Sequence, residues 1–132
     1  MDDTRTPVPR PAIRFGATVL DTPDPKGLSR FYADLLGWSV DPDDDSEDWV
    51  TIRSADGAQL MFQLATEFRA PTWPDAGIPQ QFHLDLMVQD LDAAQTYAES
   101  LGATRRRAET ERGHFRVFLD PSGHPFCLCQ TD

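Results

Sequence analysis

An internal repeat constrains the fold of this chain more than any other feature. Asp24 and Asp90 each stand where a helix is predicted to begin, and each lies 33 residues before a turn glycine, Gly57 and Gly123 respectively. Each half therefore predicts the same order: strand, helix, strand, strand, turn, strand. A single βαβββ unit cannot bury its own sheet face, so we expect two units to pair. The predicted fold class is α+β, with two βαβββ modules in tandem forming a curved mixed sheet around a concave pocket.

The two predicted helices have recognisable ends. Asp24 can accept hydrogen bonds from the first helical turn, and Pro25 suits the first helical position because its missing N–H would have no partner there. Gly37 fits the left-handed position that ends many helices. Between these ends the apolar residues follow helical spacing, at Leu28, Phe31, Tyr32, Leu35 and Leu36. The second half repeats this pattern from the cap Asp90 to Gly102.

The remaining segments predict strands and loops. Alternating or β-rich runs predict strands at 15–20, 49–53, 59–64, 82–88, 103–107, 115–119 and 126–130. Residues 41–48 hold six acids in eight positions and are interpreted as a solvated loop. We expect a flexible N-terminal lead-in at 1–12 and a single domain at 13–132. Within it, module 1 spans about 13–65, a crossing loop 66–79, and module 2 about 80–131.

Composition excludes some function classes. The formal net charge of −10 argues against binding to nucleic acid, which depends on neutralising phosphates with Lys and Arg. The sequence contains no run of 18 apolar residues, so we expect no membrane span, and we see no signal peptide. Only Cys127 and Cys129 occur, too close along one strand to form a disulfide readily. The expected location is the cytoplasm.

The motifs resemble those of a known superfamily. The helix starts PDPKGLSRFYADLLGW and QDLDAAQTYAESLGA resemble the vicinal oxygen chelate superfamily, which includes glyoxalase I, bleomycin-resistance proteins and extradiol dioxygenases. The second half, HLDLMVQDLDAA followed by DPSGHPFCLC, is most similar to its glyoxalase-like branch. The resemblance covers about residues 13–131. It implies the glyoxalase fold and a homodimer.

The resemblance also implies where a metal would be bound. Metal-dependent relatives place four ligands, typically His, Glu, His and Glu, on the first and last strand of each module. Here these vestigial positions are Ala17, Gln63 (or Met61 if no gap is allowed), His83 and Cys127. Alanine cannot bind metal, and a lone His with a thiol gives only two good zinc donors. We therefore expect no cofactor and no true glyoxalase I activity, with a weakly bound divalent metal as the alternative.

His83 and Asp85 are the best candidates for proton chemistry. They are two residues apart on one strand and so share a face, and an unperturbed histidine titrates near neutral pH. The alternative is that His83 is a hydrogen-bonded core histidine. The predicted ligand pocket comprises Gln63, Met61, Trp73, His83, Cys127 and Trp49. Trp73 is either an aromatic pocket wall or an anchor for its loop.

Three functions are compatible with these residues. The first is a protein that binds a small hydrophobic or aromatic molecule without a complete metal site, for sequestration, resistance or sensing. The second is a lyase, isomerase or dioxygenase-like enzyme that acts on a small oxygenated substrate through His83 and Asp85, with Gln63 orienting it. The third is a purely structural or interaction module. The sequence leaves open whether the protein is an enzyme.

Overall fold

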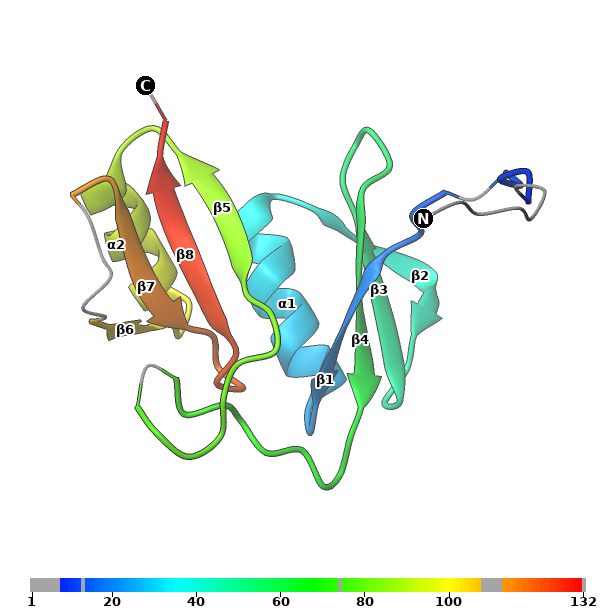
Figure 1. The fold of residues 1–132 in the computed structure, drawn as a ribbon, viewed down its shortest axis with the longest axis horizontal. Coiled ribbons are helices and arrows are strands. Elements are labelled where there is room, and N and C mark those ends of the chain that lie inside the picture. The colour runs from blue at the N-terminus through cyan, green and yellow to red at the C-terminus, as the bar shows by residue number, and fades with distance from the viewer. Residues whose placement is uncertain (1–7, 13, 74, 108–112, 132) are drawn as a thin grey trace, which may run out of the picture.

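Two similar modules make up the structure. A computed structural model describes residues 8–12, 14–73, 75–107 and 113–131, so part of the predicted lead-in lies outside the described residues. The elements are β1 (Thr18–Thr22), α1 (Pro25–Leu36), β2 (Ser39–Asp45), β3 (Trp49–Arg53), β4 (Gln59–Leu64), β5 (Leu84–Val88), α2 (Leu91–Ser100), β6 (Thr104–Arg106), β7 (Phe115–Leu119) and β8 (Pro125–Gln130). They form two four-stranded sheets in the orders β1-β4-β3-β2 and β5-β8-β7-β6 (Figure 1). The predicted βαβββ repeat is confirmed.

Both helices begin as the sequence predicts. The Asp24 side chain accepts a hydrogen bond from the Gly27 N–H at 3.0 Å, with Pro25 in the first turn. The Asp90 carboxylate accepts one from the Ala93 N–H at 3.1 Å. Each bond satisfies an N–H that the helix itself cannot pair. Gly37 ends α1 with φ 70°, a left-handed conformation that glycine adopts without steric cost.

The strand register settles how the two modules correspond. The first and last strands of each module are parallel neighbours, with Val19 opposite Met61 in one module and Asp85 opposite Cys127 in the other. Both pairs keep the spacing that relates Asp24 to Asp90. The counterpart of Cys127 is therefore Met61, the alternative without a gap. Gln63 lies two residues further along β4.

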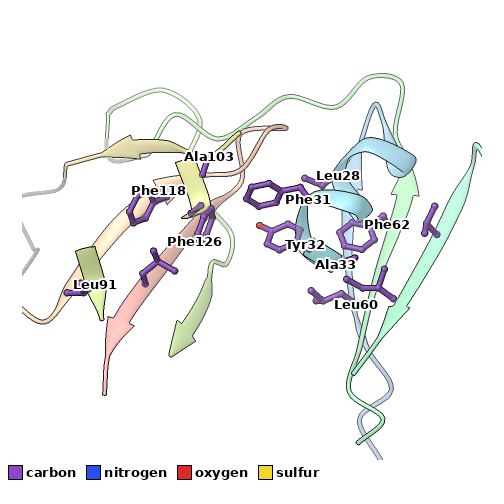
Figure 2. Close-up of a cluster of buried hydrophobic side chains, with 14 residues drawn as sticks. Leu28, Phe31, Tyr32, Ala33, Leu60, Phe62, Leu91, Ala103, Phe118 and Phe126 are labelled. Atoms are coloured by element: carbon purple, nitrogen blue, oxygen red, sulfur yellow. The ribbon is translucent and has the colours of Figure 1, made fainter. Parts of the chain in front are cut away.

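Helix α1 lies between the two sheets and gives both modules one core (Figures 1 and 2). The ring of Tyr32 is fully buried and stacks on Phe62 of β4, with 5.9 Å between centroids. Phe31 and Tyr32 also contact Phe126 of β8, at 6.0 and 6.2 Å. Burying side chains of this size stabilises a fold by about 1.5–3 kcal/mol each. The modules thus share a core, although each keeps its own sheet.

The interpretation of residues 41–48 as a loop is wrong for its first five residues, which belong to β2. This strand is the outer edge of its sheet, where acidic side chains stay in contact with water. Two of its carboxylates also form ion pairs. Asp41 lies 2.7 Å from Arg53 of β3, and Asp45 lies 2.8 Å from Arg30 of α1. The local composition shows the acidic residues, but it does not show that the fold places arginines from other elements beside them.

Two predicted strands start earlier in sequence than the observed ones. The first strand was predicted at 15–20 and is observed as Thr18–Thr22, because β4 provides pairing partners only from Thr18 onward. Likewise β5 begins at Leu84, so Phe82 and His83 lie just before it. Within the described ranges, no helix is both long and apolar enough to cross a membrane.

Candidate functional site

A cavity of about 350 Å³ lies where β1, the crossing loop and the residues leading into β5 meet. Its wall is largely apolar, formed by side chains that include Val19, Leu20, Phe68, Ile78, Phe82 and Leu84. Polar groups enter from Asp21, His83 and His124, and Tyr32 of α1 also lines it. Cavities of this size with a few polar groups are typical of small-molecule sites.

His83, Asp85 and Cys127 form a compact cluster beside this cavity. His83 Nε2 lies 3.1 Å from Asp85 Oδ1, and the ligand atoms of all three residues lie within 4.8 Å of one another. The side chains of His83 and Asp85 are 37 % and 58 % exposed, whereas Cys127 is buried. Strand geometry explains the grouping, because His83 and Asp85 share a face and Asp85 is opposite Cys127 on β8.

Trp73 of the crossing loop stacks on His83. The two ring centroids are 6.5 Å apart and the ring planes differ by 2°. Trp73 thus contacts His83 from the crossing loop, as a loop anchor would, and it is not among the residues that line the cavity. The core-histidine alternative for His83 is wrong, because its side chain is more than a third exposed.

A polar network joins the two modules next to the cavity. The Tyr32 hydroxyl donates to Asp120 Oδ2 at 2.7 Å, and both side chains are buried. The oxygens of Thr22 and Ser122 lie 2.8 Å apart. Burial raises the pKa of Asp120, because desolvation outweighs the hydrogen bonds from Tyr32 and from the backbone of its own turn. Burial and the neighbouring Asp120 carboxyl together raise the pKa of Tyr32.

His124 belongs to this network and is not the exposed turn residue that its position suggests. Its Nε2 donates to the Asp21 carbonyl oxygen at 2.6 Å, and its ring lies 4.9 Å from that of Phe68. The side chain is half-buried. By contrast, His114 is exposed.

The structure gathers some of the predicted site residues and separates others. His83, Asp85, Cys127 and Trp73 lie together. Ala17, Trp49, Met61 and Gln63 belong to the first module, and none of these four lines the cavity. Trp49 donates from Nε1 to Thr51 Oγ1 at 3.1 Å within its own sheet.

Sequence reasoning missed much of the cavity wall. Phe68 and Ile78 belong to the crossing loop, which has no periodicity that would assign its side chains to a face. Phe82 was placed inside a strand and instead precedes β5. The one available signal was the presence of large apolar residues in a segment otherwise typical of surface loops.

The four family positions do not suit a metal ion. Ala17 offers no ligand atom, and Gln63 lies opposite Asp21, away from the position equivalent to Cys127. The cluster in the second module is different, because it combines an imidazole, a carboxylate and a thiol. These three groups are all zinc ligands.

Comparisons with known proteins agree with this architecture. A family model described as "Glyoxalase-like domain" matches residues 17–129. No curated protein matches the chain significantly. Among solved structures, a glyoxalase/bleomycin resistance protein/dioxygenase family enzyme from Burkholderia phytofirmans PsJN is 18 % identical with a TM-score of 0.66, over 87 % of this chain and 96 % of that one.

Two further solved structures share the fold. The fosfomycin resistance protein FosX from Mesorhizobium loti is 12 % identical with a TM-score of 0.62, over 90 % of this chain and 92 % of that one. The oxidase ChaP-H2 is 21 % identical with a TM-score of 0.60, over 91 % of this chain and 94 % of that one. Identities this low establish a shared fold and leave the chemistry open.

Proposed function

The chain belongs to the glyoxalase-like domain family of the vicinal oxygen chelate superfamily, and on that premise we propose that it binds a small hydrophobic or aromatic molecule. The observation that carries the proposal is the largely apolar cavity of about 350 Å³ with His83 in its wall. His83, Phe68 and Phe82 contribute aromatic rings to the wall, which suits a planar ligand. Binding does not use the four-position metal site of the family, since Ala17 has no ligand atom.

The biological role proposed for this binding is sequestration, resistance or sensing. One structural neighbour is a fosfomycin resistance protein and another carries bleomycin resistance in its family name. An apolar cavity without the complete metal site of the family fits a protein that binds its ligand without converting it.

The cavity can be tested with the fluorescent dye ANS as the probe. Ile78→Glu places a carboxylate in the cavity wall and is expected to weaken dye binding by about tenfold or more, since burying an unpaired charge costs well over 1.4 kcal/mol. Val8→Glu is the matched control, because Val8 is exposed outside the cavity. Equal dye affinity in both variants would contradict the proposal. Dye affinity that is unchanged by EDTA would separate cavity binding from any metal.

A second candidate function is favoured by the 3.1 Å approach of His83 Nε2 to Asp85 Oδ1. A carboxylate that holds an imidazole in one orientation is a common device in acid–base catalysis. The enzyme would be a lyase, isomerase or dioxygenase-like protein acting on a small oxygenated substrate, with His83 moving the proton. In a panel of such substrates, Asp85→Asn is expected to lower turnover by about 10²-fold or more. Equal turnover by both proteins would exclude this role.

We propose that the protein is a homodimer. The outer edges of β1 and β5 have no strand partner among the described residues. Large apolar side chains are exposed on or just before these strands, with Phe15 at 81 % and Met87 at 64 %. Unpaired edges with exposed apolar side chains are typical of association surfaces. Light scattering is expected to show a dimer that Met87→Glu weakens and Val8→Glu does not; a monomer at all concentrations would contradict it.

The cytoplasmic location remains a proposal. Neither Cys127 nor Cys129 forms a disulfide within the described part of the chain, and cysteines that stay reduced suit a reducing compartment.

A further inference from the structure

We propose that His83, Asp85 and Cys127 bind one divalent cation of the zinc type within the second module alone. The proposal goes beyond small-molecule binding and does not depend on it. It also differs from the metal site of the family, because it uses Asp85 and takes all its ligands from two adjacent parts of one sheet.

The distances place the three ligand atoms close to a binding geometry. A zinc ion lies about 2.0–2.3 Å from its nitrogen, oxygen and sulfur ligands, so ligands on one ion are separated by roughly 3.3–3.8 Å. The three atoms here all lie within 4.8 Å of one another, and His83 Nε2 and Asp85 Oδ1 are 3.1 Å apart. An adjustment of about 1 Å completes the site. The Asp85 side chain is 58 % exposed and has room to make it.

The fold holds the ligands in place without a metal. Asp85 and Cys127 face each other in the register of β5 and β8, so their separation is fixed by backbone pairing. The ring of His83 is held by Trp73 on one face, and its Nε2 is directed at Asp85. The strand register and the ring contact therefore keep the three ligand groups together before a metal binds.

The charges of the three ligands balance a divalent ion. A carboxylate and a thiolate supply two negative charges, and a neutral imidazole supplies the third ligand. Nitrogen and sulfur ligands favour zinc-like ions over magnesium or calcium, which prefer oxygen. Three protein ligands leave one position open in a tetrahedral site, which is the arrangement of zinc sites that also bind water or substrate.

The first module shows what the same positions look like without a site. The counterparts of His83, Asp85 and Cys127 are Ala17, Val19 and Met61. Of these, only Met61 carries a ligand atom, and it is a weak thioether. The proposal therefore predicts one cation per chain.

Cobalt(II) is the probe that reports each ligand separately. Metal-free protein titrated with cobalt is expected to reach one ion per chain, with visible bands of a tetrahedral site and a sulfur-to-cobalt band in the near ultraviolet. Asp85→Asn and Cys127→Ser are expected to weaken cobalt and zinc binding at least tenfold, and Cys127→Ser to remove the sulfur band. Cys129→Ser is the matched control, because Cys129 is the other thiol of β8 and lies outside the three-residue cluster.

Three results would overturn the proposal. They are a sulfur band lost in Cys129→Ser and kept in Cys127→Ser, cobalt affinity equal in wild type and Asp85→Asn, and no zinc retained after dialysis. Asp85 is exposed, so its variant tests the site even where replacement of the buried Cys127 prevents folding. Dye binding is measured on the same proteins, so failure of the metal site and failure of the cavity are told apart.

Discussion

The Tyr32 hydroxyl donates to Asp120 Oδ2 at 2.7 Å, a buried bond between residues 88 positions apart in the two modules. Tyr32→Phe removes the donor and leaves a buried carboxyl group short of one partner. Such losses cost about 1–3 kcal/mol, so urea denaturation should show a fall of that size in the free energy of unfolding. Tyr97→Phe is the control, because the Tyr97 hydroxyl donates to the Asp34 carbonyl oxygen at the surface. Equal losses in both variants would contradict this role for the buried bond.

The raised pKa of Asp120 gives its contribution to stability a definite sign. A carboxyl group whose folded pKa lies above its ordinary value of 3.8 favours the protonated form in the fold. Its stabilising contribution is therefore complete below that ordinary value and is lost as the pH rises through the folded pKa. Asp120→Asn cannot titrate. The stability of wild type relative to this variant should fall as the pH rises from the ordinary value of 3.8 through the raised pKa of Asp120; a constant difference would contradict the prediction.

Gly123 and Gly57 are equivalent turn residues with different surroundings. Their φ angles are 96° and 95°, so alanine is strained at either position. A Cβ at Gly123 would lie 2.6 Å from the Cβ of Ala70 in the crossing loop, whereas a Cβ at Gly57 meets nothing within 4 Å. Thermal unfolding should show Gly57→Ala losing about 1–2 kcal/mol and Gly123→Ala losing more. Adding Ala70→Gly should recover only the excess, and recovery of the whole loss would show that backbone strain is absent.

Phe126 of β8 joins the sheet of the second module to α1. It is fully buried and contacts Phe31, Tyr32 and Phe118, the last at 5.5 Å between ring centroids. Phe126→Ala should lower the free energy of unfolding by about 3–5 kcal/mol. Val8→Ala, at a highly exposed position outside the proposed dimer surface, should change it by less than about 0.5 kcal/mol. A loss in Phe126→Ala no larger than that in Val8→Ala would contradict this role, whereas two separate unfolding transitions would show that the modules no longer unfold as one unit.

The sequence predicts the fold well where a residue acts through its own backbone. Asp24 and Asp90 cap the starts of their helices and Gly37 ends α1 as expected, since caps depend on local geometry. The prediction fails for β2, because the acids of that strand are paired by Arg30 and Arg53 from neighbouring elements. No local pattern records such a partner.

The candidate site shows the same division. Strand alternation is enough to place His83 and Asp85 on one face. To place Cys127 beside them, one must know the register between β5 and β8. The sequence does not give this register, and in the first module it allows either Met61 or Gln63 as the equivalent of Cys127. The contact of Trp73 with His83 depends on the path of an aperiodic loop and has no signature in sequence.

Because α1 lies between the two sheets, the two modules repeat the same backbone fold but differ in what their side chains do (Figure 2). Phe31 and Tyr32 of α1 pack against both modules, while α2 packs mainly against β8 of its own. The first module thus supplies the shared scaffold, and the second holds His83, Asp85 and Cys127. The two copies of one unit therefore have different roles, so a chain in which the sequences of the two modules were exchanged would not be the same protein.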